Sequence, residues 1–288
     1  KQYGEEISKK IINGYNTKRY VTLRINTIKA EIEDIKKVLD CSGIIYEEIP
    51  WFKEAIIVKN VREDEIKKLD IYEKGQIYLQ SLSSMIPPII LDVKQGENIL
   101  DMAAAPGGKT TQIAAMTNNK AMITACEKNK IRAERLKYNL QKQGVGCVNV
   151  MIEDARKLDD FFSFDKILLD APCSGSGTDS IFNKNFTEEL IDRSANFQKQ
   201  LLTKALKILK PGKEMVYSTC SILQNENEEV LKEVLKKFNA EVVEIENLEI
   251  SNIPLLPTTL KGTICICPTD LFEGFFVAKV KKREPAPN

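Results

Sequence analysis

Two cysteines in this chain stand in short segments whose neighbours could support chemistry. Cys173 lies in Asp170-Ala-Pro-Cys-Ser-Gly-Ser-Gly177, and Cys220 lies in Tyr217-Ser-Thr-Cys-Ser221. The chain has 288 residues and no histidine, so the commonest general base and proton carrier is absent. Nucleophilic chemistry here would therefore use a thiolate, and carboxylates would handle much of the proton transfer.

A glycine-containing turn precedes both cysteines, in Asp101-Met-Ala-Ala-Ala-Pro-Gly-Gly-Lys-Thr110. A phosphate-binding loop would require glycine at position 103, where the chain has Ala103, and the Gly-x-Gly-x-x-Gly dinucleotide motif is also missing. ATP and dinucleotides are therefore disfavoured. The remaining pattern is a strand that ends at Asp101, a tight turn of small residues, and a helix N-terminus suited to an anion.

Two further acidic residues follow the next two expected strands. Glu127 closes the strand after the glycine turn, where a carboxylate can accept from ribose hydroxyls, and Asp154 follows the third strand, where it could accept from an adenine amino group. Acidic residues at strand ends also occur simply as turn formers. Three of them after successive strands, counting Asp101, favour S-adenosyl-L-methionine, which has an amino-acid end, a ribose and an adenine.

From about residue 94 the pattern alternates strictly between strands and helices. The expected strands are 98–102, 121–126, 148–152, 166–170 and 214–218, and the expected helices begin at 108, 130, 188 and 226. Two closing strands, 263–267 and 274–280, are close together in the sequence. This α/β order predicts a Rossmann-like, doubly wound and mostly parallel sheet with an antiparallel edge. Ligands of such sheets bind beyond the C-terminal ends of the strands, where all the motifs above lie.

The first 78 residues predict a separate small α+β unit. Helices are expected at 5–12, 32–39 and 63–69, and strands at 20–26 and 55–59. Strands and helices in this order indicate a ferredoxin-like or RNA-recognition-like sheet. We therefore expect a small α+β module at 1–78 and a larger α/β domain at 79–288.

Charge and composition limit the class of protein. The net charge is +1, but residues 1–30 hold seven Lys or Arg against two Glu, so that Lys18, Arg19 and Arg24 could contact RNA phosphates; ordinary solvated charge is the alternative. The longest apolar run, Met85–Leu91, is far shorter than the ~20 residues that span a bilayer and contains two prolines. We expect a monomer that is not bound to a membrane.

The cysteine count points to a reducing compartment. Seven cysteines in a chain of this size fit the cytoplasm better than a disulfide framework, because the number is odd and the density low. With no histidine and no Cys-x-x-Cys, the sequence predicts no metal site. The five cysteines outside the two motifs are expected in the core: Cys41, Cys126, Cys147, Cys265 and Cys267.

The chain from about residue 1 to 282 resembles the Sun/Fmu-type RNA 5-methylcytosine methyltransferases. The resemblance rests on Ala104-Ala-Pro-Gly-Gly-Lys-Thr110, Asp170-Ala-Pro-Cys-Ser-Gly-x-Gly177, Ser218-Thr-Cys-Ser221 and Glu226-Asn-Glu228. It implies that residues 79–288 form a Rossmann-like methyltransferase catalytic domain and that residues 1–78 form a small RNA-binding module. It also implies that S-adenosyl-L-methionine is the cofactor, with contacts at Ala103, Ala104, Ala105, Pro106, Gly107, Gly108, Lys109, Glu127, Arg132, Asp154 and Asp170.

The resemblance also implies roles for the two motif cysteines, with Cys220 as the attacking thiol and Cys173 as the group that helps to release the product. Carbon 5 of cytosine is too weakly nucleophilic to accept a methyl group directly, and addition of a thiolate to carbon 6 activates it. Asp170 is the expected partner of the cytosine N3 and amino edge, held protonated in a closed site. The target base must leave its stack, so we expect structured RNA with unpaired bases, ribosomal RNA first and transfer RNA second.

Two alternatives stay open at the level of the sequence. A DNA cytosine-5 methyltransferase would carry its nucleophile at Cys173 and would need a large target-recognition region, for which 288 residues leave little room. A non-catalytic RNA-binding assembly factor could retain the cofactor fold, but it would have no use for two motif cysteines.

Overall fold

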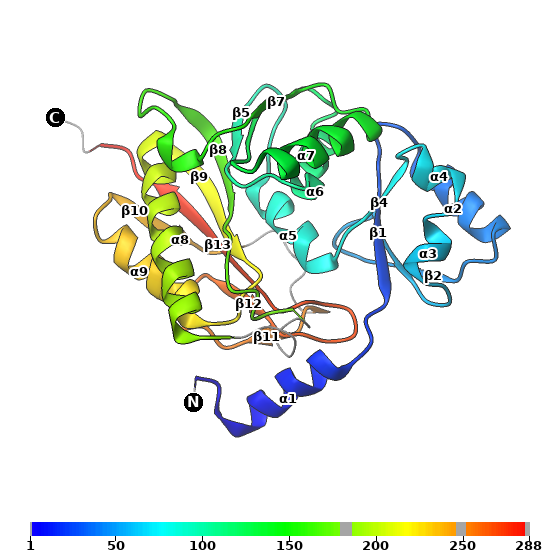
Figure 1. Cartoon of the computed structure of the whole chain (residues 1–288), viewed down its shortest axis with the longest axis horizontal. Coiled ribbons are helices and arrows are strands. Elements are labelled where there is room, and N and C mark those ends of the chain that lie inside the picture. The colour runs from blue at the N-terminus through cyan, green and yellow to red at the C-terminus, as the bar shows by residue number, and fades with distance from the viewer. Residues whose placement is uncertain (1, 179–185, 246–251, 286–288) are drawn as a thin grey trace.

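A computed structural model describes residues 2–178, 186–245 and 252–285 (Figure 1). Within these ranges the chain forms a small four-stranded sheet and a larger nine-stranded sheet, each packed against helices. No helix in the described ranges combines the length and the apolar character that a bilayer crossing needs.

The small unit is built around β1, whose residues Leu23 and Ile25 are fully buried. Its elements are β1 (Val21–Ile25), α2 (Ile32–Cys41), β2 (Tyr46–Glu48), β3 (Ala55–Val58), α3 (Glu63–Ile66), α4 (Asp70–Glu73) and β4 (Ile77–Leu79). The strand order is β2-β3-β1-β4, and all three pairings are antiparallel. This β-α-β-β-α-β arrangement confirms the ferredoxin-like sheet.

Helix α1 (Gly4–Asn16) precedes β1 in the sequence but packs on the large unit (Figure 1). Ile11 and Tyr15 belong to the same apolar cluster as side chains of the large sheet. A Cβ atom on Gly14 would lie 1.8 Å from the Pro268 carbonyl oxygen, so the helix approaches that loop as closely as backbone allows. The predicted domain boundary after residue 78 stays a prediction. Within residues 1–78, α1 packs on the large unit and not on the small sheet.

The large sheet has the order β11-β12-β13-β9-β8-β5-β6-β7, and β10 also pairs with β13. Its strands are β5 (Asn98–Asp101), β6 (Met122–Cys126), β7 (Val148–Met151), β8 (Phe164–Asp170), β9 (Leu209–Thr219), β10 (Ala240–Val243), β11 (Leu255–Leu256), β12 (Ile264–Ile266) and β13 (Phe275–Lys282). Strands β5 to β9 are parallel, and β10 to β13 are antiparallel. The predicted mostly parallel sheet with an antiparallel edge is confirmed. Within the described ranges the antiparallel part contains four strands, β10 to β13, where the sequence predicted two.

Helices cover both faces of this sheet and bury its aliphatic side chains. Apolar clusters place α5 (Leu82–Leu91), α6 (Gly108–Met116) and α7 (Lys130–Lys142) on one face. On the other face lie α1, α8 (Glu188–Ile208) and α9 (Glu228–Leu235). This three-layer packing leaves the C-terminal ends of the parallel strands as the open edge of the molecule.

Helix α5 differs from the sequence-based expectation, which left this segment as an apolar run interrupted by prolines. The helix contains Pro87 and Pro88, and most of its residues are buried. Proline at 88 cannot donate to the carbonyl of Ser84, four residues earlier. The Gln80 side chain donates to that carbonyl at 3.3 Å instead, and burial between α6 and the sheet stabilises the rest of the helix.

Candidate active site

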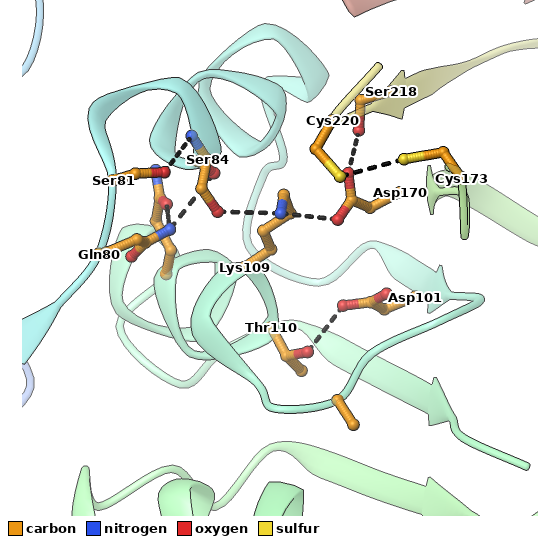
Figure 2. Close-up of polar contacts among 12 residues, drawn as sticks. Gln80, Ser81, Ser84, Asp101, Lys109, Thr110, Asp170, Cys173, Ser218 and Cys220 are labelled. Atoms are coloured by element: carbon orange, nitrogen blue, oxygen red, sulfur yellow. Dashed lines mark hydrogen bonds and ion pairs between the residues drawn. The ribbon is translucent and has the colours of Figure 1, made fainter. Parts of the chain in front are cut away.

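The two motif cysteines come together at the ends of neighbouring parallel strands. Cys173 follows β8 and Cys220 follows β9, and their sulfur atoms lie 3.0 Å apart (Figure 2). Both are free thiols and both are partly buried. A disulfide would bring the sulfurs to about 2.05 Å, so this distance describes a thiol that donates to its neighbour.

The surroundings of Cys173 favour the protonated form of its thiol. Its hydrogen bond with Cys220, its burial, and the nearby charges of Cys220 and Glu226 together raise the pKa of Cys173 well above its usual value. Two thiols this close cannot both ionise easily. Cys173 therefore retains its proton at neutral pH and can donate it to the Cys220 sulfur.

Glu226 joins the two cysteine loops, although the sequence analysis assigned it no role beyond membership of a motif. The side chain is fully buried and accepts from the Ser174 amide at 2.7 Å, the Ser174 hydroxyl at 2.5 Å and the Ser221 hydroxyl at 2.6 Å. Ser174 and Ser221 each directly follow one of the cysteines. Glu226 lies 52 residues after Ser174 in the sequence, so no local pattern could have predicted that its side chain contacts the loop of Cys173.

Asp170, the last residue of β8, lies between an ammonium and a hydroxyl (Figure 2). It accepts from Lys109 Nζ at 2.7 Å and from Ser218 Oγ at 2.7 Å. Burial alone lowers the pKa of Lys109, but the attraction to Asp170 outweighs it and the net pKa is raised. Asp170 is therefore paired with Lys109 and Ser218 in this structure, and its predicted role toward the cytosine edge stays a prediction.

A cavity of about 350 Å³ opens beside these groups. Of the residues predicted for the site, it is lined by Ala103, Ala104, Ala105, Pro106, Gly108, Lys109, Asp170 and Cys220. Gly107 is the exception in the turn, because it faces α7: its φ is 108°, and a Cβ atom there would lie 2.8 Å from Leu136. Cys173 does not line the cavity, but its sulfur contacts that of Cys220, which does.

The other predicted residues meet in a narrow second cavity of about 30 Å³, which shares Ala103 with the first. Glu127, Arg132 and Asp154 line it. Glu127 is buried and accepts from the Asn129 amide at 2.8 Å, and Arg132 Nη1 lies 3.4 Å from the Glu127 carboxylate. The predicted acids at the ends of β5, β6 and β7 therefore lie along one edge of adjacent strands.

Asp154 has a partner that sequence reasoning did not identify. Arg156 donates to both of its carboxylate oxygens, with a shortest contact of 2.6 Å. These hydrogen bonds from Arg156 lower the pKa of Asp154. The two-residue spacing in Asp154-Ala-Arg156 was the available signal.

Part of the first cavity's wall comes from segments that the sequence did not connect with the site. Tyr78 reaches it from β4, Gln80 from the connection after β4, Ser84 from the start of α5, and Phe275 from β13. Lys109 Nζ donates to Ser84 Oγ at 2.9 Å and lies 5.5 Å from the centre of the Phe275 ring. These contacts depend on the packing of distant segments, so they were not accessible from local patterns.

Two sequence-based expectations were wrong. Arg24 is only 1% exposed and cannot contact RNA phosphates at the surface, because it points from β1 into the boundary with the large unit. Cys41, expected in the core, is exposed at the end of α2, whereas Cys126, Cys265 and Cys267 are buried and Cys147 is half-buried. Among the described residues no group of three or more His, Cys, Asp or Glu could hold a metal ion.

Comparisons with known proteins identify the family and the fold of the chain. The family model for the 16S rRNA methyltransferase RsmB/F matches residues 88–281, and the model for an RsmF/B-like ferredoxin-like domain matches residues 1–63. A ribosomal RNA small subunit methyltransferase F from Aeromonas salmonicida is 37% identical over 286 residues, which cover 93% of this chain and 58% of that protein. The chain thus spans somewhat more than half the length of these ribosomal RNA relatives.

Other relatives match along most of their length. A tRNA (cytosine(49)-C(5))-methyltransferase from Pyrococcus abyssi is 37% identical over 91% of this chain and 88% of its own. The crystal structure of NSun6 from Pyrococcus horikoshii with SFG superposes with a TM-score of 0.87 at 25% identity, covering 98% of this chain and 96% of that chain. The fold is that of a methyltransferase with an N-terminal ferredoxin-like domain, and the chain belongs to the 16S rRNA methyltransferase RsmB/F family.

Proposed function

We propose that this protein transfers a methyl group from S-adenosyl-L-methionine to carbon 5 of a cytosine in structured RNA. The observation that carries the proposal is the pair of sulfurs 3.0 Å apart, one of which lines the cavity that also holds Asp170 and the glycine turn. Relatives named for ribosomal RNA and for transfer RNA are equally identical to the chain, so both RNAs are candidate substrates.

The residues around the two cavities fit the cofactor. SFG, an analogue of S-adenosylmethionine, accompanies the related NSun6 structure. In this chain Glu127 and Asp154 offer carboxylates to a ribose and an adenine, and the turn before α6 offers a helix N-terminus to a carboxylate. When bound, the cofactor supplies an activated methyl group.

Cys220 has the position to attack the base. Its thiolate adds to carbon 6, and the electron pair of the ring double bond moves to make carbon 5 nucleophilic. The Cys173 thiol can donate to the Cys220 sulfur before the attack, which stabilises negative charge there. Asp170 is placed to form hydrogen bonds with the N3 and amino edge of the cytosine, while Lys109 and Ser218 fix its orientation.

Release of the product needs a second group, which we assign to Cys173. Once carbon 5 carries the methyl group, Cys173 as thiolate takes the carbon 5 proton, the ring double bond re-forms, and the electrons of the sulfur–carbon 6 bond return to Cys220. Since the resting Cys173 is protonated, it must first lose its own proton to solvent. The chain has no histidine that could replace it.

We further propose that residues 1–78 bind RNA and residues 79–288 catalyse the reaction, in a monomer in the cytoplasm. The basic excess in residues 1–30, apart from the buried Arg24, supports RNA binding, and the seven free cysteines support a reducing compartment.

Cysteine variants test the proposal with labelled cofactor and unmodified ribosomal and transfer RNA. Cys220→Ala should abolish methyl transfer and form no covalent RNA adduct. Cys173→Ala should attack and methylate but not release, so that a protein–RNA complex survives denaturing electrophoresis and disappears after RNase treatment. Cys41→Ala, which removes an exposed thiol, is the matched control and should behave as the wild type.

Two results would contradict the assignments. Full activity of both variants without any adduct would make the cysteines structural. An adduct in Cys220→Ala and none in Cys173→Ala would exchange their roles.

A further inference from the structure

Arg24 is a fully buried cation that the proposed chemistry does not use. It is 1% exposed, and within the described ranges no ion pair joins it to a carboxylate. Its Nη1 atom is buried without a hydrogen-bond partner. Burial lowers the pKa of Arg24 to about 10, so the side chain is still charged at neutral pH. A charge in this position is costly, and its contacts indicate what it does.

The guanidinium reaches from β1 to the first turn of α6. Nη2 donates to Thr111 Oγ1 at 2.9 Å, to the Gln143 side chain at 3.3 Å and to the Gly108 carbonyl at 3.4 Å. All three acceptors belong to the large unit, and Gly108 lines the first cavity. The N-terminus of a helix is its positive end, so electrostatics alone would disfavour a cation there.

The same side chain begins a series of polar contacts that ends at Asp170. Arg24 Nε donates to Gln80 Oε1 at 3.0 Å, and Gln80 Nε2 donates to the Ser84 carbonyl at 3.3 Å. The Ser84 hydroxyl accepts from Lys109 Nζ, which also donates to Asp170 (Figure 2). Arg24 therefore supports Lys109 from two sides, through the turn that carries it and through Gln80 and Ser84.

Close contacts join the small unit to the start of α6 and to the end of α7. A Cβ atom on Gly108 would lie 3.0 Å from the Tyr78 ring, and Asn26, two residues after Arg24, donates to the Gln143 carbonyl at 2.8 Å. The small unit and the cofactor turn are thus in direct contact, and Arg24 supplies the charged hydrogen bonds between them.

We propose that Arg24 is a positioning residue for the cofactor: it holds the turn at Gly108 and Lys109 in the geometry that binds S-adenosyl-L-methionine. This inference rests on the proposed function, because it assumes that the cofactor occupies that turn. Loss of the guanidinium should weaken cofactor binding while leaving RNA binding intact, since Arg24 is not accessible to RNA.

The test compares two neighbouring positions of β1. Arg24→Met removes the guanidinium, whereas Leu23→Ala is the matched control, because Leu23 is equally buried but lies in the apolar core of the small unit. Thermal unfolding, calorimetry with S-adenosyl-L-methionine, RNA affinity by filter binding, and kcat and KM for the cofactor would be measured for both. Arg24→Met should raise the cofactor KM and Kd about tenfold or more, as expected for lost charged hydrogen bonds, with RNA affinity unchanged. Leu23→Ala should lower the unfolding temperature and leave the cofactor KM unchanged.

A purely structural role would give a different pattern. Equal increases of the cofactor KM in both variants, or an unchanged KM in a folded Arg24→Met protein, would overturn the inference. If Arg24→Met does not fold, Thr111→Val takes its place in the test, because it removes the acceptor closest to Arg24 on the large unit. An unchanged cofactor KM in Thr111→Val would also overturn the inference. Absence of cofactor binding by the wild type would overturn the proposed function itself, together with this inference.

Discussion

Asp101 carries a buried charge whose cost can be measured. It is the last residue of β5, is 1% exposed, and accepts from Thr110 Oγ1 at 2.7 Å. Burial raises the pKa of Asp101 from 3.8 to about 6, despite the hydrogen bond from Thr110 and with a contribution from the negative charge of Asp170. The folded protein therefore holds this proton more tightly than the unfolded chain does.

The rise in the pKa of Asp101 sets the size and the sign of the effect. Each pKa unit between the unfolded and folded states is worth about 1.4 kcal/mol, so the rise from 3.8 to about 6 corresponds to about 3 kcal/mol. Because the folded-state pKa is the higher one, this stabilisation is complete below pH 3.8 and is lost as the pH rises through 6. About 2 kcal/mol remains at pH 4.5 and almost none at pH 7.5.

Asp101→Asn keeps an oxygen that can accept from Thr110 but cannot ionise. When the pH rises from 4.5 to 7.5, the free energy of unfolding of the wild type should fall by about 2 kcal/mol relative to that of the variant. Urea unfolding at both pH values measures the difference, and the comparison between proteins cancels the titration of all other groups. Asp64→Asn, at an exposed position on α3, is the control. A variant-minus-wild-type difference that does not change with pH would refute the reasoning.

Two further predictions follow from the cysteine site. Because the raised pKa of Cys173 keeps its proton in place, release should quicken as the pH increases, and the fraction of wild-type protein trapped on RNA should fall between pH 6.5 and 9; a pH-independent fraction would exclude Cys173 as the base. Glu226→Gln replaces an oxygen that accepts from Ser174 and Ser221 by an NH₂ group that donates. The free energy of unfolding in urea should therefore fall by about 2 kcal/mol, and the rate of single-turnover methylation should fall about tenfold. Glu228→Gln leaves those hydrogen bonds intact and should retain the wild-type rate of methylation. Unchanged methylation in folded Glu226→Gln would show that this carboxylate does not align the cysteines.

Much of the fold could be predicted because it depends on local patterns. The apolar strands and amphipathic helices from residue 98 onward recur at the expected places, since strand and helix periodicity is a property of neighbouring residues. The short strands β2, β4, β10 and β11 were missed, because two to four residues hold too little periodicity to recognise. Helix α5 was missed because two prolines oppose it locally and only packing stabilises it.

The sequence by itself determined that Glu127 and Asp154 follow adjacent strands and that two cysteines stand in turn motifs near one edge of the sheet. Parallel strands end at a common edge, so order along the chain was enough to predict that these residues would be neighbours. Only the tertiary structure decided the 3.0 Å approach of the sulfurs, the ion pair of Lys109 with Asp170, and the burial of Arg24. These features depend on side chains from segments far apart in the sequence, and their geometry is set when the two sheets and their helices pack together.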